Sequence, residues 1–127
     1  MAEIKNLIKR VFTKELEKDK TITVFDLFNW KKVNVLLKDH KTNKVLLDMK
    51  DLEFPEHYSQ NSCDIIASKY FRKSGVNNKK GYEDSMKLVA HRLVNFWCEA
   101  LMDETIIKSE EEKSVLYDEL VYAFLNQ

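Results

Sequence analysis

Glycine, proline and cysteine are scarce in this chain: among 127 residues there are two glycines, one proline and two cysteines. So little glycine and proline excludes collagen-like and low-complexity sequence, and two glycines cannot build a glycine-rich loop that cradles phosphates. The cysteines, Cys63 and Cys98, are too few for a disulfide framework and lack CxxC spacing. We therefore predict a cytoplasmic protein in which both thiols are buried, since a free cysteine behaves as a small hydrophobe.

Net charge and long apolar runs are also absent. The chain has 21 basic and 21 acidic residues, so its overall charge gives no reason to expect nucleic acid or an anionic membrane as a partner. No apolar run approaches the roughly 20 residues that span a bilayer. The N-terminus has neither the continuous apolar core nor the cleavage site of a secretory signal. We expect neither a nucleic-acid nor a membrane partner.

What the chain does contain is 44% hydrophobic residues, and their spacing changes along the sequence. Residues 3–17 place apolar side chains at helical intervals, which predicts an amphipathic helix. These side chains are Ile4, Leu7, Ile8, Val11, Phe12 and Leu16. Residues 33–50 alternate instead, in two β-rich runs around a polar turn at 39–43, which predicts a β-hairpin. An isolated hairpin is marginal in water, so it must pack on something.

Three further helices are predicted after Pro55, which closes the hairpin section. One is expected over residues 58–73, followed by a loop over 73–81 that contains both glycines. Residues 83–102 carry a wide apolar stripe, so we expect the most buried helix there. Ser109 and Glu112 form a capping-box pattern that begins a last helix. The predicted fold class is α+β: a mainly helical single domain of residues 1–127, with three to four helices and an N-terminal β-hairpin.

Residues that could carry chemistry are few. His40, His57 and His91 stand at none of the spacings by which histidines share a metal ion, so no metal ligand is assigned. A nucleophile would have to be Cys63 or Cys98 with a histidine base, but both cysteines stand among apolar residues of predicted helices, which favours burial. We assign no catalytic, cofactor-binding or metal-binding residue, and the residues alone predict a small domain without an active site of its own.

Charged and aromatic clusters each allow two interpretations. The acidic run Glu110–Glu112 could be a metal or partner patch, but acidic residues in a first helical turn also complement the helix dipole. The lysine-rich stretch 77–80 could contact phosphates or lie in a solvated loop. Seven Phe, five Tyr and two Trp are more than core packing requires, so some are expected at the surface, where aromatic residues are enriched in interface cores.

The segment from Phe54 to Lys73 reads FPEHYSQNSCDIIASKYFRK and resembles the N-terminal domain of adenosylcobalamin-dependent (class II) ribonucleotide reductases. That family has Pro-Glu followed by an aromatic residue, then Ser-Gln-Asn, a stretch ending in Ala-Ser-Lys-Tyr-Phe, and a basic residue. The matching residues here are Pro55, Glu56, Tyr58, Ser59, Gln60, Asn61, Ile66, Ala67, Ser68, Lys69, Tyr70, Phe71 and Arg72. The family usually has Trp at the position of Tyr58.

Weaker similarities follow in the family's order and extend the resemblance over nearly the whole chain. They are Phe12-Thr13, Phe25-Asp26, Trp30, Ser85 to Arg92, Glu119-Leu120 and Leu125-Asn126-Gln127. The chain departs from the family at Lys32-Val33, where an arginine often follows the tryptophan. In the family, the last helix leads into a catalytic α/β barrel that holds the reactive cysteines and the cobalamin site. None of those roles falls on Cys63 or Cys98.

The resemblance implies a non-catalytic N-terminal domain or small subunit of a reductase that makes deoxyribonucleotides for DNA replication by radical chemistry. It implies adenosylcobalamin in the assembled enzyme, no cofactor bound by this chain, and a catalytic barrel chain as partner. Met1 at the start and the absence of a tag favour a separate gene product over an excised domain. The predicted partner interface consists of Tyr70, Phe71, Tyr117, Tyr122 and Phe124. Two alternatives stay open: the same domain in a radical reductase with a metal cofactor on another subunit, and an unrelated helical adaptor.

Overall fold

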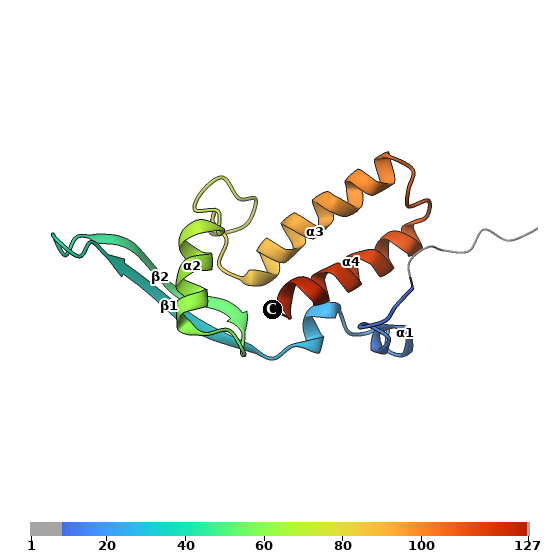
Figure 1. The fold of residues 1–127 in the computed structure, drawn as a ribbon, viewed down its shortest axis with the longest axis horizontal. Coiled ribbons are helices and arrows are strands. Elements are labelled where there is room, and N and C mark those ends of the chain that lie inside the picture. Colours follow the sequence, from blue (N-terminus) through green and yellow to red (C-terminus); the bar gives the residue numbers. More distant parts are fainter. Residues whose placement is uncertain (1–8, 127) are drawn as a thin grey trace, which may run out of the picture. The chain divides into compact units, whose positions relative to one another are not determined.

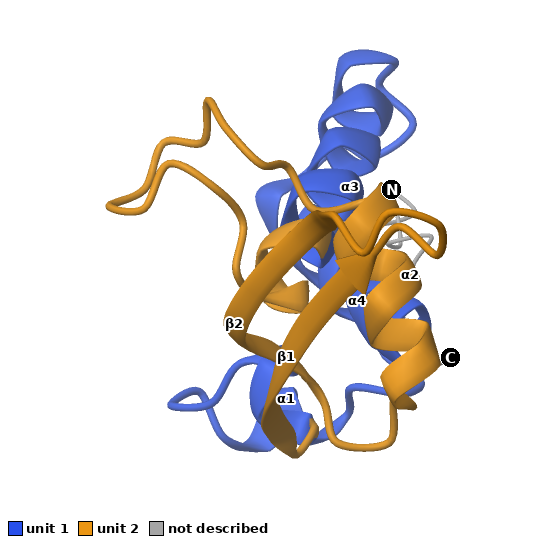
Figure 2. Cartoon of the chain, turned by 90° about the vertical axis from the view of Figure 1, so that its left-hand side faces the viewer, with its two compact units in different colours: residues 1–27, 90–127 blue, residues 28–89 orange. Residues whose placement is uncertain are grey.

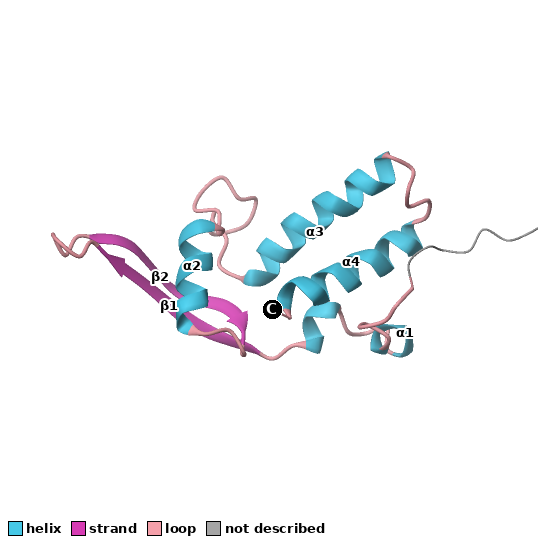
Figure 3. Cartoon of the chain, viewed as in Figure 1, coloured by secondary structure: helices cyan, strands magenta, loops and turns pink. Residues whose placement is uncertain are grey.

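The computed structural model describes residues 9–126 and has an α+β fold (Figures 1 and 3), which confirms the predicted class. Two antiparallel strands form the hairpin, and helices precede and follow it. In chain order the elements are α1 (Glu15–Lys18), the 3-10 helix η1 (Val24–Leu27), β1 (Trp30–Lys38), β2 (Val45–Pro55), α2 (Gln60–Lys69), α3 (Met86–Asp103) and α4 (Glu110–Leu125).

These elements divide into two compact units (Figure 2). One unit consists of residues 28–89 and contains the hairpin, α2 and the first residues of α3. The other consists of residues 1–27 and 90–127 and contains α1, η1, most of α3 and α4. Each unit is described by itself below, and the single domain inferred from the sequence stays a prediction.

The hairpin is longer than the alternating residues alone indicate. Pairing begins at Trp30 opposite Pro55, and Val33 lies opposite Leu52, both buried. A register shift follows Val33, where the backbone N–H of Asp51 donates to Asn34 Oδ1 at 2.9 Å and Asp51 adopts φ 55°. Such a bulge increases the local twist of the strands. The predicted polar turn is confirmed between the strands.

Helix α2 packs on β1 and supplies much of the core of this unit. Ser59 caps the helix, since its side chain accepts from the backbone N–H of Ser62 at 3.1 Å. Cys63 and Ala67 are fully buried, and the ring of Phe54 from β2 stacks on Phe71 at 5.3 Å between centroids. The helix predicted over 58–73 is therefore confirmed with tighter limits, and the glycine-containing loop follows it.

In the other unit, α4 begins as the sequence predicts. Ser109 accepts from the backbone N–H of Glu112 at 3.1 Å, and three acidic residues occupy the first turn. Those acidic residues complement the positive end of the helix dipole. Helices α3 and α4 are joined by a hydrogen bond of 2.6 Å between His91 Nδ1 and the Tyr117 hydroxyl, and by an ion pair between Lys113 and Glu99.

The amphipathic helix predicted over residues 3–17 is wrong for its described part. Residues 9–14 are not helical, and α1 has only four residues, Glu15–Lys18. The reason is a competing acceptor: the backbone N–H groups of Val11 and Phe12 donate to the carboxylate of Glu119 in α4. Ile4, Leu7 and Ile8 lie outside the described residues.

Candidate functional site

The residues that carry the family resemblance join α2 to the hairpin. Gln60 Nε2 donates to the backbone oxygen of Asn34 at 3.0 Å, and Lys31 Nζ donates to the backbone oxygen of Tyr58. Burial, together with the neighbouring Cys63, raises the pKa of Tyr58 to about 12, so its hydroxyl stays protonated near neutral pH. These hydrogen bonds connect the segment with strand β1, so its role in the described structure is structural.

A second set of hydrogen bonds connects the two ends of the glycine-containing loop. Glu83 is buried, its carboxylate accepts from the backbone N–H of Arg72 at 2.8 Å, and its own N–H donates to the Arg72 oxygen at 2.8 Å. Ser85, at the start of α3, donates to Glu53 Oε1 at 2.7 Å. Lys87 lies 4.8 Å from the centre of the Trp30 ring, within the range of a cation–π contact.

The carboxylate of Glu119 in α4 accepts hydrogen bonds from residues 11–13, and we call these four residues the Glu119 cluster. Its carboxylate accepts from the N–H of Val11, from that of Phe12 at 3.0 Å, and from the hydroxyl of Thr13 at 3.1 Å. Burial alone would raise the pKa of Glu119, but the N–H groups of Phe12, Val11 and Thr13 and the Thr13 hydroxyl outweigh it and hold this pKa below its usual value. The cluster replaces the helical hydrogen bonds that this segment lacks.

An ion pair stands beside the Glu119 cluster. Arg10 donates to Asp118 Oδ2 at 2.7 Å, and the same Arg10 nitrogen donates to the Thr13 hydroxyl at 3.1 Å. Burial raises the pKa of Asp118 even though Arg10 opposes the rise, and the nearby Glu119 adds to it. Residues 10–13 are thus tied to α4 by two neighbouring carboxylates.

Two of the five predicted interface residues fall in the unit of residues 28–89. Tyr70 follows α2 and is 58% exposed. Its neighbour Phe71 is 3% exposed and stacks on Phe54. Tyr70 is therefore accessible to a partner, whereas Phe71 belongs to the core.

The other three fall on α4 and do not share one face. Tyr117 and Phe124 are seven residues apart, which is close to two helical turns, whereas Tyr122 lies about 140° around the axis from Tyr117. All three are partly exposed. Tyr122 stacks on Phe12 at 5.5 Å, and burial first, then Asp118 and Cys98, raises the pKa of Tyr117 to about 12. Their part in an interface stays a prediction.

Helix α3 carries an exposed apolar surface that was not predicted from the sequence. Phe96 is 70% exposed and Trp97 is 43% exposed, while Val94 and Cys98 of the same helix are fully buried. The helix expected to be the most buried therefore leaves part of its wide apolar stripe exposed. The available signal was the width of the stripe: Phe96 lies about 200° from Val94 around the axis, so both cannot face one core.

Both thiols are buried, as predicted. Cys63 and Cys98 have no exposed surface, and burial raises the pKa of each above its ordinary value. A buried, protonated thiol is a poor nucleophile, which disfavours the alternative of a cysteine nucleophile. Within residues 9–126, no group of three or more His, Cys, Asp or Glu side chains is arranged to hold a metal ion.

A shallow hollow of about 560 Å³ opens beside β2 in the unit of residues 28–89. Its lining mixes acidic, basic and apolar side chains: Leu47, Asp48, Met49, Lys50, Asp51, Lys73, Lys80 and Tyr82. Lys80 is already paired with Asp84 at 2.7 Å, and Lys73 donates to the backbone oxygen of Phe71 at 2.6 Å. This lining offers no broad apolar wall for a corrin ring, so it does not fit a cobalamin.

Comparison with known proteins gives the family. A family model described as class II vitamin B12-dependent ribonucleotide reductase matches residues 32–127. The vitamin B12-dependent ribonucleotide reductase of Streptomyces coelicolor is 30% identical over 103 residues, which are 81% of this chain and 10% of that protein. The corresponding enzymes of Streptomyces avermitilis and Streptomyces clavuligerus are 28% and 27% identical over the same shares. No solved structure matches the chain significantly.

The matched residues thus identify a domain of the ribonucleotide reductase family. The chain belongs to the class II vitamin B12-dependent ribonucleotide reductase family, as its N-terminal domain. It spans about one tenth of the length of the curated relatives it matches. None of the described helices is both long and apolar enough to cross a membrane.

Proposed function

We propose that this chain is a non-catalytic N-terminal domain or small subunit that packs on a separate catalytic barrel of a class II ribonucleotide reductase. The observation that carries the proposal is the proportion of the match: 81% of this chain aligns with only 10% of each relative. The buried thiols support it, because radical and redox chemistry needs cysteines that a substrate or reductant can reach.

The assembled enzyme would convert ribonucleotides to deoxyribonucleotides by replacing the ribose 2′-hydroxyl with hydrogen. Adenosylcobalamin would supply the radical chemistry, and the barrel would hold both cofactor and substrate. This chain would supply no catalytic residue and would act by packing on the barrel. The alternative of a helical adaptor without a reductase role predicts no affinity for a reductase chain.

The proposal is tested by combining this chain with the larger reductase chain of the same organism. We expect the two to elute as one complex, and ribonucleotide reduction with adenosylcobalamin and a thiol reductant to be higher for the complex than for the larger chain alone. Equal activity without this chain, together with no binding, would refute the association.

The non-catalytic role has its own test. The variants Cys63→Ala and Cys98→Ala are expected to keep the activity of the complex at temperatures where each variant is folded. Circular dichroism establishes the temperature range in which each variant is folded. Loss of turnover in a folded variant that still binds the larger chain would show that a thiol of this chain takes part in the chemistry.

A further inference from the structure

The exposed apolar residues of α3 lie together on one face, which we call the α3 outer surface (Phe96, Trp97 and Ala100). Phe96 and Ala100 are four residues apart and so are neighbours on the helix. All three are exposed, and Phe96 is the most exposed of the large apolar residues in the described part of the chain, at 70%. This surface belongs entirely to the unit of residues 1–27 and 90–127.

The opposite face of α3 already packs in the core of the protein. Ala90, Val94 and Cys98 are fully buried there. A surface helix ordinarily has one apolar face and one polar face. On the exposed side of α3, Phe96, Trp97 and Ala100 stand beside the polar residues His91, Glu99 and Asp103, so large apolar side chains remain uncovered there. Phenylalanine and tryptophan side chains at the centre of the α3 outer surface are also typical of the residues that dominate binding energy at interfaces.

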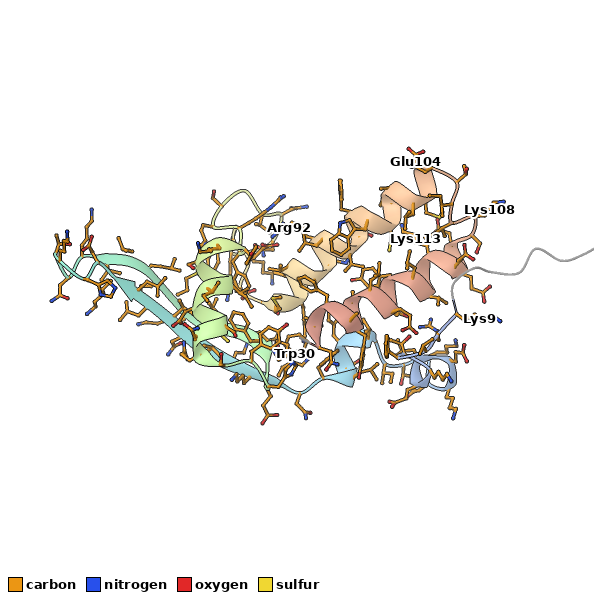
Figure 4. The ribbon with its side chains drawn as sticks, in the orientation of Figure 1. Lys9, Trp30, Arg92, Glu104, Lys108 and Lys113 are labelled. Carbon is orange, nitrogen blue, oxygen red and sulfur yellow. The ribbon has the colours of Figure 1, made fainter. Side chains whose placement is uncertain are left out.

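Charge distinguishes the two ends of this surface. Figure 4 shows Arg92 in the first half of α3, Glu104 directly after its last residue, and Lys108 further on, in the loop that leads to α4. Asp103 and Glu104 are exposed at the end of α3, and the last turn of α3 contains no basic residue. Within residues 9–126 neither carboxylate forms an ion pair. Both stand at the negative end of the helix dipole, where a cation is favourable and an anion is not.

We propose that the α3 outer surface docks on the catalytic portion of a class II reductase, and that this partner presents an apolar recess for Phe96 with basic residues at the edge that faces Asp103 and Glu104. The inference rests on the function proposed above. The share of the relatives that lies outside the match argues for this occupant: nine tenths of each relative has no counterpart here, and that portion is available to cover the surface.

The apolar part of the proposal is tested with Phe96→Gln and a matched control, Leu46→Gln. Leu46 is 64% exposed and lies on the hairpin, in the other unit. Glutamine suits an exposed helix position, so the Phe96 variant is expected to fold with the melting temperature of the natural chain. Isothermal titration with the larger reductase chain of the same organism should show a dissociation constant at least about tenfold higher for Phe96→Gln and an unchanged one for Leu46→Gln.

The charged part is tested with Asp103→Asn combined with Glu104→Gln. We expect slower association and a weaker dependence of the association rate on salt, because steering by rim charges acts mainly on that rate. A partner with acidic residues at this edge would give the opposite change and would overturn this part of the proposal.

The outcomes separate this inference from the proposed function. If the natural chain does not bind the larger chain, the proposed function fails and the docking surface fails with it. If the natural chain binds and Phe96→Gln binds equally well, only the docking surface is refuted. Self-association that Phe96→Gln abolishes, seen by sedimentation, would assign the surface to a second copy of this chain and would also overturn the inference.

Discussion

Removal of the Glu119 carboxylate is the sharpest test of how the first described residues are held. In Glu119→Ala the helix keeps a good helix former, but the donors of residues 11–13 lose their acceptor. Val11 and Phe12 are 65% and 59% exposed, so water replaces the carboxylate at their N–H groups at little cost. Thr13 is fully buried, so its N–H and hydroxyl carry most of the penalty.

The magnitude follows from those two buried groups. A buried donor without a partner costs about 1–3 kcal/mol, and the Arg10 guanidinium, which donates to the Thr13 hydroxyl at 3.1 Å, offers the O–H no acceptor in place of Glu119. For the two Thr13 donors we therefore expect Glu119→Ala to lower the free energy of unfolding by about 2–6 kcal/mol. Glu119→Gln retains an acceptor oxygen, and its cost should be about 1 kcal/mol, since a neutral hydrogen bond is weaker than a charged one.

The assay combines urea denaturation with amide hydrogen exchange. Denaturation gives the free energy of unfolding, and exchange at Thr13 reports whether the segment opens locally. Glu111→Ala is a matched control, because Glu111 is an exposed acidic residue of the same helix and loses only its interaction with the dipole, under about 1 kcal/mol. If Glu119→Ala is no less stable than Glu111→Ala, and the exchange of Thr13 is unchanged, the Glu119 cluster does not hold this segment.

Further predictions concern pH, the core, the helix cap and the thiols. Because the folded-state pKa of Glu119 lies below its ordinary value of 4.5, the stability it contributes is present above that value and is lost as pH falls through the folded pKa; the stability difference between the natural chain and Glu119→Gln should therefore shrink in acid urea titrations. Burial raises the pKa of Asp118, so acid favours the folded state at that site, opposite to its effect at Glu119. In Asp118→Asn this acid stabilisation should be lost from the pH dependence of the free energy of unfolding. Phe71→Ala should cost about 3–5 kcal/mol in the same denaturation assay, because Phe71 is buried against Phe54. Ser109→Ala should cost about 1 kcal/mol through loss of the α4 cap, measured as a lower melting temperature. Both cysteines should react with a thiol reagent only after urea is added, and fast labelling of the folded chain would contradict their burial.

Local patterns predicted the hairpin and the start of α4. Alternation around a polar turn identified β1 and β2, and the Ser109 cap marked the first residue of α4, because both signals depend on neighbouring residues alone. The bulge at Asn34 and Asp51 could not be read in the same way, since it depends on a hydrogen bond between residues seventeen positions apart.

The errors arose where distant residues compete with a local pattern. Residues 11–16 have helical spacing, yet Glu119, more than a hundred residues away, takes the N–H groups that an early helix would use. In α3 the apolar residues were treated as one wide stripe, although Phe96 and Val94 point to opposite sides of the helix. Periodicity identifies the apolar residues of a helix, but it does not show which of them are buried in the core and which stay exposed.

If the α3 outer surface is the docking site, as proposed, its central residue Phe96 lies outside the segment by which the family was recognised. Ser59, Gln60, Ala67 and Phe71, which made the resemblance recognisable, cap, join or fill the fold. Phe96, which is not part of that segment, contributes little to the core and is open to a partner. A change in the first group should therefore lower stability and binding together, as Phe71→Ala would, whereas Phe96→Gln should lower binding at unchanged stability. Measuring stability and binding for both variants therefore distinguishes a residue that stabilises the fold from one that contacts the partner.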